Sequence, residues 1–166
     1  MTQLHLDRRT FLLASGAAVL ASSPALGADA FAASPFRKLS EADWRKRLPS
    51  DAFEVLRHEA TERPGTSDLL HEKRKGVFAC AGCDLPLFTS DMKFDSGTGW
   101  PSFFTTIPGV FDTKKDHYLI YPRTEYHCKR CGGHHGHVFD DGPQPTGERW
   151  CNNGVALKFL PKDAKG

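Results

Sequence analysis

A short segment near residue 40 places apolar residues at helical spacing. In "LSEADWRKRL", Leu39, Trp44 and Leu48 fall near one face of a helix. Ser40, followed three residues later by Asp43, predicts a capped helix start. We expect these apolar residues to pack in the core.

A second helix is predicted directly after Pro49, which ends the first. Ser50 is expected to cap "DAFEVLRHEATE", in which Phe53, Leu56 and Ala60 share an apolar stripe. The turn sequence "RPGTSD" follows and ends this helix.

The pattern changes from Lys75 onward to short runs of apolar or alternating residues. Gly, Pro and Asp separate these runs, which is typical of strands joined by tight turns. The runs are "GVFAC", "LPLF", "HYLIYP", "TEYHC", "HVF" and "RWCNNGVALKF". We therefore predict a mainly β fold of antiparallel sheet, preceded by short helices.

Composition narrows the class of protein further. A chain of 166 residues with 39% hydrophobic content is long enough for one domain with a substantial core. The 22 basic and 20 acidic residues give a net charge of +2 without a long basic run. This balance provides no electrostatic footprint for nucleic acid.

The amino-terminal segment has the pattern of an export signal. Arg8 and Arg9 precede an apolar run over residues 11–21, and small residues with Pro24 follow. The run is shorter than the roughly 20 residues that span a bilayer, and the paired arginines resemble a twin-arginine signal. An amino-terminal anchor helix is the alternative. We expect a signal peptide over 1–30, a linker over 31–39 and one domain over 40–166, hence a soluble periplasmic protein.

Four of the five cysteines form two C-x-x-C pairs. "CAGC" contains Cys80 and Cys83, and "CKRC" contains Cys128 and Cys131. Two such turns supply the four thiolates of a closed tetrahedral zinc site, which is structural because no ligand position stays open. Two disulfides are the competing interpretation, since an oxidising periplasm permits them. The ligand spacing favours one structural zinc ion.

The fifth cysteine, Cys151, stands outside these pairs. If "ERWCNNGVALKF" is one strand, alternation places Arg149, Cys151 and Asn153 on one face and Asn152 on the other. A nearby guanidinium favours the thiolate, which is the nucleophilic form of cysteine. A small buried hydrophobe is the alternative.

Three imidazoles follow the second cysteine pair in "GGHHGH". Cysteine with histidine is a recurrent arrangement for nucleophilic chemistry. Surface exposure or packing around the metal site is the alternative interpretation of the histidines.

Several motifs together resemble the B-type methionine sulfoxide reductases, which act on the R epimer of methionine sulfoxide. They are "CAGCDLPLF", "FDSGTGWPSF", "CKRCGGHHGHVFDDGPQPTGERWCNN" and "ALKF", in this order, from about Ser40 to Phe159. The resemblance implies two antiparallel sheets packed as a distorted barrel or tent, with short amino-terminal helices. It also implies a structural zinc held by the four paired cysteines.

The resemblance also implies residue roles. Cys151 matches the nucleophile, which attacks the sulfoxide sulfur, releases methionine and is left as sulfenic acid. Trp100 matches the indole that packs on the substrate methyl group, and His134 and His137 match the histidines that orient or protonate the sulfoxide oxygen. Further polar groups of the site are matched by Arg149, Asn153 and Asp141, although a turn-forming role would also explain Asp141 in "FDDGP".

Some positions depart from the family pattern. Thr98 stands where many members have the cysteine that resolves the sulfenic acid, so we expect an external reductant, either a thioredoxin-like protein or a small thiol. His135 and Asn152 replace apolar residues, and Gly154 replaces a small polar one. Alternation turns Asn152 away from the site, so we expect only packing consequences there.

The expected partners are methionine-R-sulfoxide, free or in proteins, and the thiol reductant. No nucleic acid, no stable membrane association after export and a monomeric state are expected. A zinc-clasped binding module without catalysis is one rival interpretation, but it gives Cys151 no role. A Cys–His hydrolase is another, but it lacks a clear oxyanion-hole loop and gives Trp100 no role.

Overall fold

The computed structural model describes residues 31–117 and 121–162. The predicted signal over 1–30 lies outside the described residues, as does the middle of the predicted strand "HYLIYP". Among the helices of the described part, none is both long and apolar enough to span a bilayer.

The predicted cap of the first helix is confirmed. Helix α1 spans Glu41–Arg47, and the Ser40 hydroxyl accepts a hydrogen bond from the Asp43 amide at 3.2 Å. The Asp43 carboxylate in turn accepts from the Ser40 amide at 3.0 Å. This reciprocal pair satisfies amides that the helix start would otherwise leave without partners.

The predicted cap of the second helix is wrong. Helix α2 spans Ser50–His58, with Pro49 at the cap position and no side-chain cap. Proline fixes the extended backbone that enters the helix, so Ser50 becomes its first residue. The helix ends at Glu59, whose φ is +58°, and Ala60 therefore lies beyond it.

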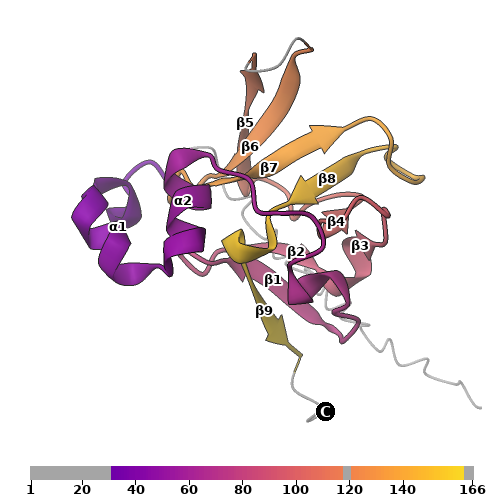
Figure 1. Cartoon of the computed structure of the whole chain (residues 1–166), viewed down its shortest axis with the longest axis horizontal. Helices are drawn as coiled ribbons and strands as arrows, with labels where there is room; N and C mark the ends of the chain where they lie inside the picture. Colours follow the sequence, from indigo (N-terminus) through magenta and orange to yellow (C-terminus); the bar gives the residue numbers. More distant parts are fainter. Residues whose placement is uncertain (1–30, 118–120, 163–166) are drawn as a thin grey trace, which may run out of the picture.

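Two antiparallel sheets make up most of the domain, as predicted (Figure 1). The smaller sheet has the order β2-β1-β9, and the larger has the order β3-β4-β8-β7-β6-β5. The strands are β1 Gly76–Cys80, β2 Pro86–Thr89, β3 Lys93–Phe94, β4 Ser102–Phe103, β5 Phe111–Asp116, β6 Arg123–Cys128, β7 His134–Phe139, β8 Arg149–Asn152 and β9 Leu157–Pro161. Short 3-10 turns are η1 Pro35–Lys38, η2 Asp68–Leu70, η3 Ser90–Met92 and η4 Gly154–Ala156.

The single strand expected over "RWCNNGVALKF" is wrong. Strand β8 ends at Asn152, η4 turns the chain, and β9 continues in the other sheet. The Glu62 carboxylate accepts hydrogen bonds from the backbone amides of Gly154 and Val155 at 2.5 and 3.1 Å. These bonds stabilise the turn because they satisfy amides that have left the strand ladder.

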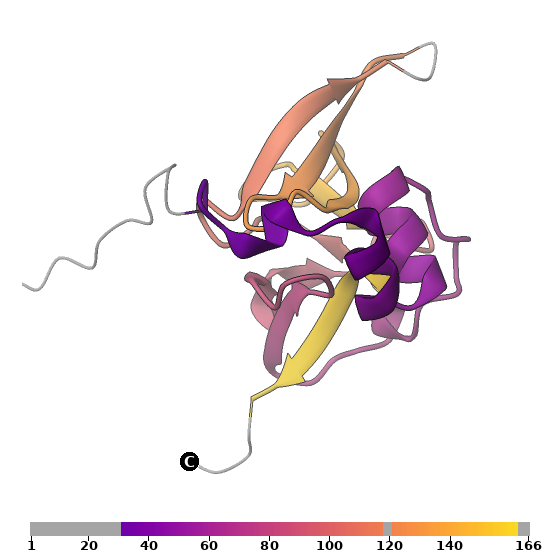
Figure 2. The same cartoon turned by 90° about the vertical axis from the view of Figure 1, so that its left-hand side faces the viewer.

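An aromatic core fills the space between the sheets. Phe88 stacks on Phe103 with ring centroids 3.9 Å apart, and Phe78 meets Phe103 edge to face. Tyr126 and Trp150 extend this packing from the larger sheet. Figures 1 and 2 show α1 and α2 side by side against one end of the sheets, where α2 contacts β7 and η4.

Candidate active site and metal centre

The four paired cysteines meet in one buried cluster. Their sulfur atoms all lie within 4.8 Å of one another, with Cys80 to Cys131 at 3.7 Å and Cys83 to Cys128 at 3.5 Å. Tetrahedral ligands about 2.3 Å from a zinc ion lie roughly 3.8 Å apart, so the spacing fits zinc. The five cysteines form no disulfide, and the paired set could hold one metal ion.

The cluster joins the two sheets. One cysteine pair belongs to the turn between β1 and β2, and the other to the turn between β6 and β7. Trp44 of α1 packs over the first turn, where a Cβ on Gly82 would lie 3.3 Å from its ring. Leu56 of α2 packs over the second turn, where a Cβ on Gly133 would lie 2.8 Å from it. A larger residue at Gly82 or Gly133 would require the Trp44 or Leu56 side chain to shift.

Cys151 lies in the middle of the larger sheet and lines a pocket of about 110 Å³. In the strand register it stands opposite His137 of β7 and Ser102 of β4. Directly opposed residues point to the same face, so the thiol and the imidazole share one side of the sheet. Of the predicted site residues, this pocket is lined by Trp100, His137, Cys151 and Asn153.

The environment of Cys151 works in two directions. Burial raises the pKa of its thiol, while the nearby Arg149 guanidinium and a hydrogen bond from the Thr98 side chain lower it. Burial outweighs these effects, and the pKa of Cys151 is raised overall. Arg149 does favour the thiolate, as expected, but its effect is smaller than that of burial. Thr98, which makes the hydrogen bond, therefore lies beside Cys151.

Arg149 is fixed by Asp141. The guanidinium donates from Nε to Oδ1 at 2.7 Å and from Nη2 to Oδ2 at 2.9 Å, and it stacks over the Phe139 ring. The hydrogen bond from Arg149 lowers the pKa of Asp141. Asp141 itself is largely exposed and is not among the pocket-lining residues, so it acts on the site through Arg149.

Glu62, which was not among the predicted site residues, contacts two residues that line the pocket. Its carbonyl accepts from the Trp100 indole at 3.1 Å, and its amide donates to the Asn153 side-chain oxygen at 3.0 Å. The Asn153 amide group donates to the His135 carbonyl at 2.9 Å. The Glu62 backbone thus positions both Trp100 and Asn153, which line the pocket.

The two predicted histidines differ in position. His137 lines the pocket, whereas His134 is 1% exposed and lies behind it, with the two ring centroids 5.6 Å apart. Burial lowers the pKa of His134 to about 3. Burial also lowers the pKa of His137, against a hydrogen bond to Asp116 that raises it. Both rings are therefore neutral near pH 7.

His135 and Asn152 face the core, as expected for Asn152. Both are fully buried, and His135 Nδ1 lies 3.3 Å from the Asn152 side-chain oxygen. Burial lowers the pKa of His135 to about 4, so it is a neutral donor in this pair. The two side chains thus form one buried contact.

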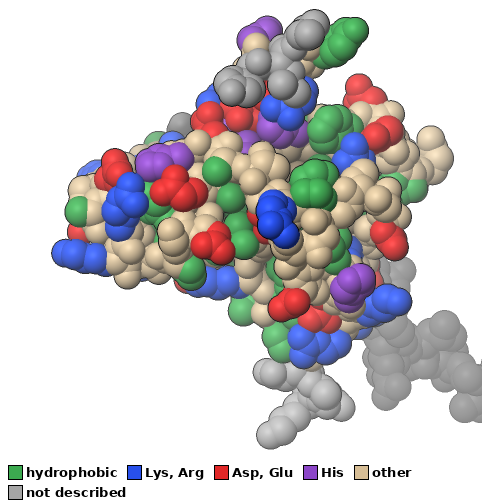
Figure 3. Space-filling view, in the orientation of Figure 1, with side chains coloured by type: hydrophobic (Ala, Val, Ile, Leu, Met, Phe, Trp, Pro, Cys, Tyr) green, Lys and Arg blue, Asp and Glu red, His purple; other side chains and the backbone are tan. Residues whose placement is uncertain are grey.

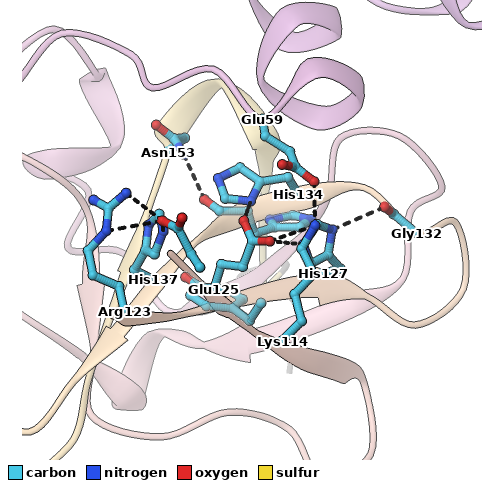
Figure 4. A network of polar contacts seen from close by, with 12 residues as sticks. Glu59, Lys114, Arg123, Glu125, His127, Gly132, His134, His137 and Asn153 are labelled. Atoms are coloured by element: carbon cyan, nitrogen blue, oxygen red, sulfur yellow. Dashed lines mark hydrogen bonds and ion pairs between the residues drawn. The ribbon is translucent and has the colours of Figure 1, made fainter. Parts of the chain in front are cut away.

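Charged residues of β5 and β6 surround the histidines (Figure 4). Glu125, His127 and His134 offer three ligand atoms within 4.8 Å of one another, a second group able to hold a metal ion. However, the Lys114 ammonium lies 2.7 Å from a Glu125 oxygen and already supplies a cation there. Figure 3 shows acidic, basic and histidine side chains gathered at the base of this hairpin.

Fold and site together define a class: a cysteine-clasped two-sheet domain with one thiol in an aromatic-walled pocket beside a histidine. Residues 48–161 match the family model described as the SelR domain. The chain belongs to the B-type methionine sulfoxide reductases, and hence to the enzyme class peptide-methionine (R)-S-oxide reductase.

Curated relatives match over most of this chain. The peptide methionine sulfoxide reductase MsrB of Agrobacterium fabrum is 48% identical over 129 residues, covering 77% of this chain and 96% of that protein. MsrB of Methanosarcina barkeri is 50% identical over 125 residues, covering 75% and 88%. The chloroplastic peptide methionine sulfoxide reductase B1 of Arabidopsis thaliana is 49% identical over 125 residues, covering 75% and 62%.

Proposed function

We propose that this protein reduces the R epimer of methionine sulfoxide, with Cys151 as the nucleophile. The observation that carries the proposal is one partly exposed thiol in a small pocket, directly across the strand pair from His137 and walled by Trp100. A pocket of about 110 Å³ suits a methylsulfinyl group, since a water molecule occupies about 30 Å³.

The chemistry assigns each group a part. Cys151 sulfur attacks the sulfoxide sulfur, and a proton supplied by the thiol or through His137 goes to the sulfoxide oxygen. The S–O bond of the substrate and the new S–S bond then break, so that methionine leaves with its sulfur reduced and the oxygen is transferred to the Cys151 sulfur, which is oxidised to sulfenic acid. Trp100 packs on the substrate methyl group, Asn153 lines the pocket beside it, and Arg149 acts through its charge on Cys151.

The experiment supplies purified protein and dithiothreitol with separated R and S epimers of a methionine sulfoxide substrate. We expect methionine release from the R epimer alone and its loss in Cys151→Ser with fold and metal content retained. If the folded wild-type protein turned over neither epimer, the proposed activity would be rejected in favour of a non-catalytic binding module.

The reductant is proposed to be external. Thr98 beside Cys151 provides no thiol, and the other four cysteines are buried in the cluster. Two external thiol equivalents convert the sulfenic acid to thiol and water through a mixed disulfide. Mass spectrometry of substrate-oxidised enzyme should show Cys151 as sulfenic acid or mixed disulfide; an internal disulfide would contradict this.

Zinc is the proposed ion of the four-cysteine cluster, one per chain. The buried, all-sulfur donor set of this spacing supports it, and such a site contributes to folding rather than to the reaction. Elemental analysis should find one zinc per purified chain.

Export to the periplasm is also proposed, with repair of oxidised periplasmic proteins as the role. Arg8, Arg9 and the apolar run after them support the twin-arginine route. Cell fractionation should find the protein in the periplasm and the Arg8→Lys/Arg9→Lys variant in the cytoplasm. Equal distribution of the two would reject this route.

A further inference from the structure

Two neighbouring ion pairs connect β5 and β6, and the cation lies on β5 in one pair and on β6 in the other. In the strand register, Lys114 is directly opposite Glu125, and Asp116 is directly opposite Arg123. Lys114 Nζ lies 2.7 Å from Glu125 Oε1, and Arg123 Nη2 lies 2.6 Å from Asp116 Oδ2. Opposed side chains share a face, so both pairs lie on the side of the sheet that carries Cys151.

Each carboxylate of these pairs also reaches a histidine of β7. Asp116 Oδ2 lies 2.9 Å from His137 Nε2 and makes a hydrogen bond. Glu125 Oε2 lies 3.3 Å from His134 Nδ1. Figure 4 shows Arg123 beside His137 and Lys114 beside Glu125. His134 and His137 are therefore each backed by a carboxylate that is paired with a cation on the neighbouring strand.

This arrangement has a clear physical effect on His137. A carboxylate that accepts a hydrogen bond from Nε2–H fixes the orientation and tautomer of the ring, and it stabilises the imidazolium. Arg123 acts in the opposite sense, because a nearby cation disfavours a second positive charge. Asp116 is 12% exposed, so solvent screens these contacts only partly.

We propose that Asp116, held by Arg123, is the positioning residue for His137, orienting the ring and stabilising the proton that it carries during the reaction. This proposal rests on the proposed function, in which the sulfoxide oxygen receives a proton through His137. The groups facing His137 are Asp116 from β5, Arg123 and Glu125 from β6, His134 from β7 and Cys151 from β8, with His58 and Glu59 across the adjoining groove.

The decisive experiment compares Asp116→Asn with Arg123→Met. By NMR titration, we expect the pKa of His137 to fall in Asp116→Asn and to rise in Arg123→Met, relative to wild type. The alkaline limb of the kcat profile should move in the same two directions. At neutral pH, kcat of Asp116→Asn should drop about 10-fold to 100-fold, as expected for weakened acid–base assistance.

Asp112→Asn is the matched control, since Asp112 lies on the same strand but pairs with Arg37 and Lys129 at the surface. It should leave kcat and the His137 titration unchanged. Asp116→Glu should restore part of the loss. Displacement of the His137 pKa in the same direction in both test variants, or no displacement, would overturn the proposal.

The NMR titration requires no turnover, so it separates the two proposals. A wild-type protein without reductase activity that still shows the opposite pKa displacements would reject the proposed function and retain the Asp116–His137 coupling.

Discussion

The buried contact between His135 and Asn152 shows that a polar residue in a core is explained by its partner rather than by its own type. Each alone would place an amide or an imidazole in the aromatic core. Together they form one hydrogen bond, from His135 Nδ1 to the Asn152 side-chain oxygen, on the face of the sheet opposite to Cys151. Stability, rather than the reaction, depends on this pair.

A double-mutant cycle tests that interpretation. His135→Leu alone should lower the free energy of unfolding by about 1–3 kcal/mol, because the Asn152 side-chain oxygen loses its buried donor. Adding Asn152→Ile should recover most of this loss. Urea unfolding of the wild type, both single variants and the double variant gives the four values. Losses that simply add would contradict the pairing.

At the scale of the element, a β-bulge decides which histidines share the site. Strict alternation would place His135 with His137 and turn His134 to the other face. The register between β6 and β7 shifts after Tyr126, so that His127 faces His134 while Glu125 faces His137. The shift brings His134 onto the face of His137 and sends His135 into the core.

Gly136 permits this bulge through close approach. A Cβ at this position would lie 2.0 Å from the Cys151 carbonyl oxygen. Gly136→Ala should therefore separate β7 from β8, with a loss of unfolding free energy of about 1–3 kcal/mol or more and a steep fall in kcat. Gly97→Ala is the control, since its methyl meets nothing within 4 Å and costs only the left-handed backbone penalty of about 1 kcal/mol. Thermal melts and R-epimer turnover should be measured for both variants. A Gly136→Ala variant as active and stable as the wild type would contradict this role of Gly136.

Sequence reasoning succeeded where the signal is local. The Ser40 cap, the β-rich pattern and the two cysteine pairs all rest on spacing within a few residues. It failed at Glu62, Asp116 and Arg123, because their partners lie on other strands or beyond a turn. Strand β5, "FDTKKD", is polar along most of its length, so alternation gives no sign that it carries a residue facing His137.

At the scale of the whole molecule, the four-cysteine cluster connects the two sheets at one point. The β1–β2 turn of the small sheet and the β6–β7 turn of the large sheet supply two sulfurs each, and α1 and α2 pack over them. Structural zinc contributes about 10–16 kcal/mol of apparent binding free energy, which is comparable to the 5–15 kcal/mol that stabilises a whole domain. With the proposed zinc bound, the fold and the pocket should therefore both depend on the ion.

Cys131→Ser removes one ligand while leaving the pocket residues in place. We expect loss of the bound zinc, a far lower melting temperature and disappearance of the near-ultraviolet circular dichroism that reports aromatic packing. Cys151→Ser, the other single-sulfur change, should keep one zinc per chain and a melting temperature near that of wild type. Because the cluster joins the two sheets, both sheets of the zinc-free protein should unfold together in a single thermal transition. Retention of native aromatic packing by a zinc-free Cys131→Ser variant would mean that the two sheets hold together without the metal.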